Sequence, residues 1–150
     1  MASSEIEIAN LVYRYAEHID SGDFEGAAGL FSHARIKTAQ GELGPAEVLE
    51  MWRSSIILYE DGTPRTKHVI TNPIIEVDEA AGVGTCRTYY TVMQQAEDGP
   101  LEPVICGRYH DTFERIEGRW RFRHRDYSLH DLPGDMSRHS RNRAKPHPKA

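Results

Sequence analysis

The 150-residue sequence has few cysteines and no long hydrophobic run, and both absences narrow its class. No apolar stretch approaches the roughly 18 residues that a membrane-spanning helix needs. Cys86 and Cys106 are the only cysteines, and both lie in apolar, strand-like segments without metal-ligand spacing. We expect reduced core thiols there rather than a disulfide or a nucleophile. The N-terminal MASSEIEIAN lacks the basic and apolar regions of a signal peptide, so we expect a cytoplasmic protein.

Motifs for metals and nucleotides are missing as well. The eight histidines form no His-x-His, HExxH or Cys/His cluster. The segments GPLEP and GELGP contain turn residues, not the glycine-rich loop that cradles phosphates. We therefore expect neither a metal ion nor an organic cofactor.

Charge is distributed unevenly along the chain, whose net charge is −5. Residues 1–134 carry 13 basic and 22 acidic side chains, whereas residues 135–150 carry five basic and one acidic. The acidic body would repel nucleic acid, and the last residues include two prolines and almost no apolar side chains. We expect one domain over residues 1–133, a basic and flexible tail over 134–150, and no nucleic-acid or membrane partner. His139 and His147 fall in this tail and are set aside as site residues.

The first 58 residues have the periodicity of helices. One apolar stripe at helical spacing consists of Ile8, Val12, Tyr15 and Ile19. Gly22 suits the left-handed position after this helix, and Asp23 can cap a short second helix, FEGAAGLF. Gly44 and Pro45 are typical of the start of a helix, here a third one that extends to about Leu58. A short strand is predicted between them, at residues 34–39.

From residue 65 the pattern changes to the alternation of strands. Long strands are predicted at residues 65–78, 83–96, 103–116 and 119–130, with a tight turn at Glu117-Gly118. Asn72-Pro73 indicates a bulge within the first of them. Three helices followed by an antiparallel meander predict an α+β domain, with helices on one face of a curved sheet. Such a sheet leaves an internal apolar pocket, a common site for small ligands.

Alternation also predicts which side chains of the last two strands face inward. On the last strand, the predicted inward set is Trp120, Phe122 and His124, and the predicted outward set is Arg119, Arg121, Arg123 and Arg125. We interpret the arginines as a solvated face rather than an anion site. On the preceding strand, His110 shares a face with Cys106, Arg108 and Thr112, opposite Tyr109, Asp111 and Phe113.

Four segments, taken in order, resemble SnoaL-like members of the nuclear-transport-factor-2-like superfamily. They are YRYAEHIDSGDFEGAAGLF and GPAEVLEMW in the helices, TKHVITNPIIEVD in the first long strand and GRYHDTFERIEGRWRFRHR in the hairpin. The resemblance extends over most of residues 5–130. It implies a cone-shaped α+β barrel, with N-terminal helices packed on a strongly curved antiparallel sheet, and makes residues 1–133 a SnoaL-like domain.

Within this superfamily the chain is most similar to scytalone dehydratase and related dehydratases, which share a His–Asp pair at the pocket floor. The matching residues are Asp20, at the end of the first helix, and His68, near the start of the first long strand. An acid at a helix C-terminus opposes the helix dipole, and the resemblance gives it a role as the partner of His68. The dehydratases' pocket tyrosine matches Tyr15 best, with Tyr13 as a rival on helical geometry.

Other pocket residues are less closely defined. Apolar walls would come from Trp52, Tyr89, Tyr90 and Met93, although each also suits an ordinary core position. Scytalone dehydratase has a second pocket histidine on the meander, and either His110 or His124 can take that place here.

A neutral imidazole held by a buried carboxylate is a suitable general base at neutral pH. The resemblance therefore implies a cofactor-independent lyase of the dehydratase type, which removes a proton from a small cyclic or aromatic-like apolar molecule. The alternatives are a polyketide-cyclase-like isomerase and a non-catalytic pocket protein or partner subunit, similar to the small subunit of ring-hydroxylating dioxygenases. In each case we expect a homodimer or homotrimer, since open sheet faces in this fold are commonly covered by a second copy.

Overall fold

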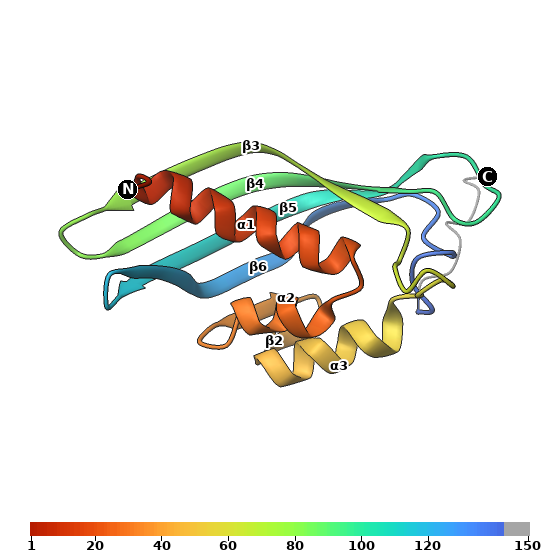
Figure 1. The fold of residues 1–150 in the computed structure, drawn as a ribbon, viewed down its shortest axis with the longest axis horizontal. Coiled ribbons are helices and arrows are strands. Elements are labelled where there is room, and N and C mark those ends of the chain that lie inside the picture. Colours follow the sequence, from red (N-terminus) through yellow and green to blue (C-terminus); the bar gives the residue numbers. More distant parts are fainter. Residues whose placement is uncertain (143–150) are drawn as a thin grey trace.

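The structure, a computed structural model, describes residues 1–142 and consists of three helices and a curved six-stranded sheet (Figure 1). The helices are α1 (Ser4–Asp20), α2 (Phe24–Leu30) and α3 (Pro45–Ser55). The strands are β1 (Arg35–Thr38), β2 (Gly41–Leu43), β3 (Thr66–Asp78), β4 (Val83–Gln94), β5 (Glu102–Ile116) and β6 (Arg119–Pro133). Their order in the sheet is β2-β1-β6-β5-β4-β3. The predicted α+β class, with N-terminal helices packed on a strongly curved sheet, is confirmed.

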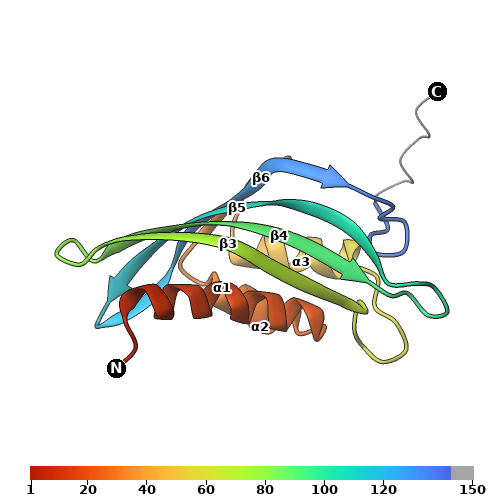
Figure 2. The same cartoon turned by 90° about the horizontal axis from the view of Figure 1, so that it is seen from above.

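Three details of this architecture differ from the prediction. Strand β2 was not predicted, because its three residues are too few to show alternation. Strand β1 pairs with β6 in parallel, which makes the sheet mixed rather than purely antiparallel. Helix α3 ends at Ser55, three residues before Leu58. All three helices lie on the same side of the sheet, under its curve (Figure 2).

The ends of the helices follow the predicted local chemistry. Asp23 caps α2 by accepting a hydrogen bond from the Gly26 backbone N–H, at 2.9 Å. Gly44 is the N-cap of α3, and Pro45 follows in its first turn. Gly22 has a φ of 79°, and a Cβ there would lie 2.2 Å from the Gly62 carbonyl oxygen. The turn after α1 therefore needs glycine for both its backbone angle and its close packing.

Helix α1 brings the end of its last turn to the start of β3. Its N-terminus lies at the β3–β4 turn, and it runs along β3 in the opposite direction (Figure 1). Aromatic side chains fill the part of the core beneath the first turns of α1. The ring centre of Phe122 is 4.7 Å from that of Phe113 and 4.5 Å from that of Phe31. The opposite end, where Asp20 meets β3, contains the cavity described below.

Two of the register shifts in the sheet bear on the predictions made from the sequence. Asn72 has a φ of 55°, and the β3–β4 register shifts between Thr71 and Ile74, so the predicted bulge is confirmed. A second shift lies between Thr112 and Phe113, where Thr112 pairs with His124 and Phe113 pairs with Phe122.

This second shift reverses the facing of β6 after Phe122, because one extra residue flips every following side chain to the other face. Phe122 and Arg125 are both buried, whereas Arg123 is exposed. The predictions that His124 faces inward and that Arg125 faces solvent were therefore wrong. His124 instead contacts Glu42, with its Nε2 2.9 Å from the carboxylate oxygen.

Residues 134–142, assigned above to the tail, pack against the domain. Met136 and His139 are buried in this segment, and the Gly134 N–H donates to the Val104 carbonyl at 2.8 Å. The rest of the predicted tail, including His147, lies outside the described residues. Among residues 1–142, no helix combines the length and the apolar character that crossing a membrane requires.

Candidate active site

Asp20 and His68 meet where the end of α1 lies against the start of β3. Asp20 Oδ1 is 2.6 Å from His68 Nδ1, and Asp20 Oδ2 accepts the His68 backbone N–H at 2.7 Å. The Thr66 hydroxyl donates a third bond to Asp20 Oδ1, at 2.8 Å. Only 6% of the His68 side chain and 10% of the Asp20 side chain are exposed. The structure thus brings together the two residues that the sequence nominates as catalytic.

Hydrogen bonding decides the charge of Asp20. Burial raises the pKa of Asp20, but the bonds from the His68 ring, the His68 backbone and Thr66 outweigh it, so the pKa lies below its ordinary value. An ionised Asp20 only accepts hydrogen bonds, which places a proton on His68 Nδ1. Nε2 is then the nitrogen of His68 that is left to act on a bound molecule.

A cavity of about 310 Å³ lies beside His68, on the concave side of the sheet. Its apolar wall is formed by Tyr15, Ile19, Met51, Trp52, Ile56, Tyr90, Val92, Ile105, Tyr109, Tyr127 and Met136. Polar groups that reach it include His68, Ser128 and His139. The volume and the five aromatic side chains of the wall, which are Tyr15, Trp52, Tyr90, Tyr109 and Tyr127, suit a small ring-containing ligand.

A second, more open depression of about 710 Å³ also reaches the pair, between α1 and the start of β3. Tyr13, Glu17 and Lys67 contribute to its lining. His68 borders both spaces, whereas Asp20 borders only the outer one. The aromatic cavity is the better candidate site, because exclusion of water strengthens the electrostatic interactions that a base needs. Of the two rival tyrosines, Tyr15 lines this cavity and Tyr13 does not.

The predicted substrate-binding residues separate into two groups. Tyr15 and Trp52 line the cavity. Tyr89 is 45% exposed on the outer face of the sheet, where the Arg108 guanidinium lies 5.3 Å from its ring centre. His110 belongs to the same outer face of β5 as Arg108. Tyr89, His110 and His124 are therefore outside the cavity, and Tyr90, with the opposite parity to Tyr89, lines it.

Arg125 lies beneath the tyrosines of the cavity. Its Nε and Nη2 donate to the two carboxylate oxygens of Asp111, at 2.7 and 2.8 Å, and neither side chain is exposed. Its guanidinium carbon is 4.3 Å from the ring centre of Tyr15 and 3.9 Å from that of Tyr109. Both contacts are within the range of cation–π interactions. The strand alternation concealed this arginine because the register shift of β6 is not visible in the sequence.

The charges of this buried pair support each other. Burial lowers the pKa of Arg125, but the charge and hydrogen bonds of Asp111 outweigh it, and the pKa lies above its ordinary value. Burial also raises the pKa of Asp111, yet two parallel bonds to a guanidinium keep the carboxyl group ionised. Burial raises the pKa of Tyr15 despite the opposing charge of Arg125, so its hydroxyl keeps its proton at neutral pH.

Sequence reasoning missed His139. This residue lies in a segment without helical or strand periodicity, and it is only 7% exposed, with its side chain at the edge of the cavity. The one sequence signal was the apolar Met136 three residues before it, which is also buried. Only Met136 and His139 are buried among residues 134–142, so the composition of this segment does not show that it packs against the domain.

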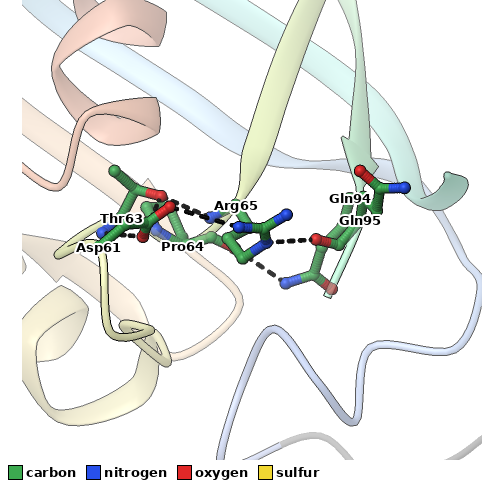
Figure 3. A network of polar contacts seen from close by, with 6 residues as sticks. All are labelled: Asp61, Thr63, Pro64, Arg65, Gln94 and Gln95. Carbon is green, nitrogen blue, oxygen red and sulfur yellow. Dashed lines mark hydrogen bonds and ion pairs between the residues drawn. The ribbon is translucent and has the colours of Figure 1, made fainter. Parts of the chain in front are cut away.

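The loop before β3, the strand that carries His68, is held by a polar network (Figure 3). Arg65 Nε donates to the Gln95 carbonyl at 2.7 Å, and the Gln95 N–H donates to the Arg65 carbonyl at 3.1 Å. Gln94 Nε2 donates to the Pro64 carbonyl at 3.0 Å. Asp61 accepts two bonds from Thr63, at 2.8 and 3.0 Å. The start of β3 is thus tied to the end of β4.

Among residues 1–142, no group of three or more His, Cys, Asp or Glu side chains is arranged to hold a metal ion. The site therefore offers a base, an orienting carboxylate and hydroxyl groups in an apolar cavity. This arrangement can move a proton to or from carbon.

Solved structures with the same fold come from several bacteria. A Mycobacterium tuberculosis protein of unknown function is 25% identical, with a TM-score of 0.66 over 85% of this chain and 70% of that one. A Novosphingobium aromaticivorans protein named as a candidate scytalone dehydratase is 20% identical, with a TM-score of 0.64 over 97% and 93%. The β subunit of a candidate aromatic-ring-hydroxylating dioxygenase from the same organism is 16% identical, with a TM-score of 0.67 over 91% and 95%.

No curated protein matches the chain. The model of the SnoaL-like domain family matches residues 1–126, which include helices α1 to α3, most of the cavity wall and the Asp20–His68 pair. The chain belongs to the SnoaL-like domain family.

Proposed function

We propose that the protein is a cofactor-independent lyase of the dehydratase type, with His68 as general base and Asp20 as the residue that orients it. The observation that carries this proposal is the buried hydrogen bond of 2.6 Å between Asp20 and His68 at the wall of an aromatic cavity. The carboxylate holds the ring in one tautomer and stabilises the imidazolium that forms when Nε2 accepts a proton.

The reaction needs only a proton carrier. His68 Nε2 removes a proton from a carbon next to a carbonyl. The electron pair of the C–H bond forms the C=C bond of an enolate, and the π pair of the carbonyl moves to its oxygen. The enolate then reforms the carbonyl while the bond to a hydroxyl group on the next carbon breaks, and the departing hydroxide takes the proton back from His68. The products are a conjugated ketone and water. An isomerase would use the same base and return the proton to a different carbon.

The cavity limits the substrate to a small, largely apolar ring compound. Its volume of about 310 Å³ accommodates one or two rings, and Trp52, Tyr90 and Tyr109 offer flat aromatic surfaces. The family is consistent with this chemistry, and one neighbour of the same fold is named as a candidate scytalone dehydratase.

The test is elimination of water from a panel of cyclic β-hydroxyketones, followed by the ultraviolet absorbance of the conjugated product. We expect His68→Gln to lower kcat by about 10²- to 10⁴-fold, the usual contribution of a general base. His33→Gln is the matched control, because His33 is an exposed histidine outside the cavity. Equal turnover by His68→Gln and the wild type would show that the base is another group.

We also propose that a homodimer or homotrimer forms through the outer face of the sheet. A row of paired residues crosses four strands there: Val69, Thr91, Cys106 and Leu132. Val69 and Leu132 are exposed, as are Ile74 and Tyr89 on the same face. Neighbouring exposed apolar side chains on one sheet face suit an interface between copies.

Light scattering after size-exclusion chromatography tests this assembly. We expect Leu132→Lys to shift the protein towards the monomer, because a lysine cannot be buried without a partner. Leu101→Lys makes the same change at another exposed leucine, in the β4–β5 loop, and should leave the assembly unchanged. A monomeric wild-type protein would contradict the proposal.

A further inference from the structure

Residues 134–142 close one side of the cavity and carry His139 into it. The His139 carbonyl accepts a hydrogen bond from the Ile57 N–H at 2.9 Å, and the Arg141 N–H donates to the Ser55 carbonyl at 2.8 Å. Ser140 pairs with Ile56 as an isolated antiparallel bridge. The backbone on both sides of His139 is thus fixed to the end of α3 and the residues that follow it.

The side chains of Tyr59 and Gln94 fix the backbone of Arg138, the residue before His139. The Arg138 carbonyl accepts the Tyr59 hydroxyl at 2.5 Å and Gln94 Nε2 at 3.2 Å. Gln94 is the same residue that binds the Pro64 carbonyl near the start of β3. The Gln94 side-chain amide therefore connects the segment that carries His139 with the segment that leads to His68. This connection helps to fix the positions of the two histidines relative to each other.

The ring of His139 has an unused polar group in this buried place. Within the described residues, its Nδ1 is buried and has no hydrogen-bond partner, although the ring lines the cavity. A buried N–H without an acceptor is rarer than an unsatisfied acceptor, which favours the tautomer with the proton on Nε2. Nε2 is then the N–H that is available to a molecule in the cavity.

The two histidines of the cavity differ in their surroundings. His68 has a carboxylate partner, and His139 has none within the described residues. Burial, and to a smaller extent the nearby His68, lower the pKa of His139 to about 4, although Asp20 opposes them. His139 therefore stays neutral at neutral pH, while His68 has the carboxylate that stabilises a proton. Such a division assigns different roles to the two rings.

We propose that His139 donates a hydrogen bond from Nε2 to the oxygen that becomes negatively charged when His68 removes the proton, an inference that rests on the proposed lyase function. In that step the C–H bond breaks and its proton goes to His68 Nε2. The electron pair of that bond forms a C=C bond, and the π pair of the carbonyl moves to its oxygen. His139 keeps its own proton throughout. Hydroxide later leaves with the proton from His68, so no further reactant is needed.

A neutral donor suits this position better than a charged one. A second imidazolium beside protonated His68 would repel it in a cavity with little water. A fixed neutral N–H stabilises the developing oxyanion without that cost, as preorganised donors in other enzymes do. The Tyr109 hydroxyl is less available as a donor, because it is already hydrogen-bonded to Tyr15.

The experiment measures binding of 4-nitrophenol, a planar probe whose absorbance distinguishes phenol from phenolate. The phenolate oxygen represents the enolate oxygen. We expect His139→Leu to weaken phenolate binding by roughly 10- to 100-fold, the effect of losing a hydrogen bond to a charged acceptor. His139→Gln keeps an N–H donor and should recover most of the affinity. His33→Leu is the control at an exposed histidine.

Nitrogen NMR of the wild-type protein gives a second readout that does not depend on a variant folding. We expect the His139 Nε2 resonance to be that of a neutral N–H and to move when the phenolate is added. A wild-type protein that binds phenolate no better than His139→Leu, or an unmoved His139 resonance at saturation, would overturn the inference. Neither measurement needs turnover, so it does not depend on whether His68 is the base. An error in that assignment would be seen separately, because His68→Gln would then not slow elimination.

Discussion

The domain contains two buried pairs of an acid and a base, and they differ in what surrounds them. Asp111 and Arg125 share two hydrogen bonds, and both side chains are completely inaccessible to solvent. Asp20 and His68 share one side-chain bond, and the ring of His68 borders a cavity. The first pair is enclosed by aromatic rings, whereas the second has a nitrogen that a ligand can reach.

This difference separates a structural pair from a reactive one. A guanidinium keeps its charge at any physiological pH, so Arg125 cannot exchange a proton in the working range. Imidazole can, and only His68 of the two bases has an unblocked side. The two pairs are nevertheless connected, because Tyr15 contacts the Arg125 guanidinium on one side and the His68 ring on the other, with ring centres 6.2 Å apart.

The largest expected effect comes from breaking the enclosed pair. Arg125→Met leaves Asp111 buried without its partner, and we expect the free energy of unfolding to fall by about 3–5 kcal/mol. Urea unfolding at neutral pH measures this change. The double variant Asp111→Leu with Arg125→Met should regain much of the loss, because a buried pair replaced by apolar side chains is often as stable. No recovery in the double variant would show that the pair itself contributes net stability.

A smaller effect is expected from Asp20→Asn at the reactive pair. The amide has one oxygen for the donors Thr66 and His68, so the free energy of unfolding should fall by about 1–3 kcal/mol. The amide also leaves the tautomer of His68 unfixed, and elimination should slow by about 10²- to 10⁴-fold. Compared with Arg125→Met, Asp20→Asn should lower the free energy of unfolding less. It should lower the rate of elimination more for each kcal/mol of stability that is lost.

The pH dependence of the same variant sharpens the contrast. The pKa of Asp20 is lowered in the folded protein from its ordinary value of 3.8, so the unfolded chain binds the proton first as the pH falls. The stabilisation from its ionised form is complete above 3.8 and is lost as the pH falls below 3.8 through the folded pKa. Urea unfolding of both proteins at a series of pH values should show a difference that shrinks as the pH falls below 3.8. A constant difference at all pH values would contradict the lowered pKa.

The sequence predicted the reactive pair better than the enclosed one, for physical reasons. Asp20 and His68 lie at the ends of strongly periodic segments, and a family resemblance linked them across 48 residues. Arg125 follows a register shift whose cause is the pairing with β5, which a single strand does not reveal. Local signals such as the Asp23 cap and the bulge at Asn72 were correctly predicted, because they depend on neighbours in the chain.

The packing of residues 134–142 against the domain could not be predicted from the sequence either, because it also depends on residues that are distant in the chain. His139 is positioned by hydrogen bonds to Ile57 and, through Arg138, to Tyr59 and Gln94, all of them more than 40 residues away. No pattern within residues 134–142 encodes those partners. Tyr89 and Tyr90 illustrate a milder failure, since neighbouring tyrosines in a strand are both acceptable core residues until the parity is known.

The smallest expected effect concerns a third acid–base pair, His124 with Glu42, which repeats the chemistry of His68 with Asp20 in solvent. The nitrogen–oxygen distance is 2.9 Å, but 33% of the His124 side chain and 45% of the Glu42 side chain are exposed. Because water and salt screen such contacts, His124→Gln should change the free energy of unfolding by no more than about 1 kcal/mol and leave elimination unchanged. Urea unfolding and the same elimination assay, run beside His68→Gln, measure both. If the two substitutions slowed elimination equally, burial and the cavity would not be what distinguishes His68, and a contact between imidazole and carboxylate would be insufficient to locate the base.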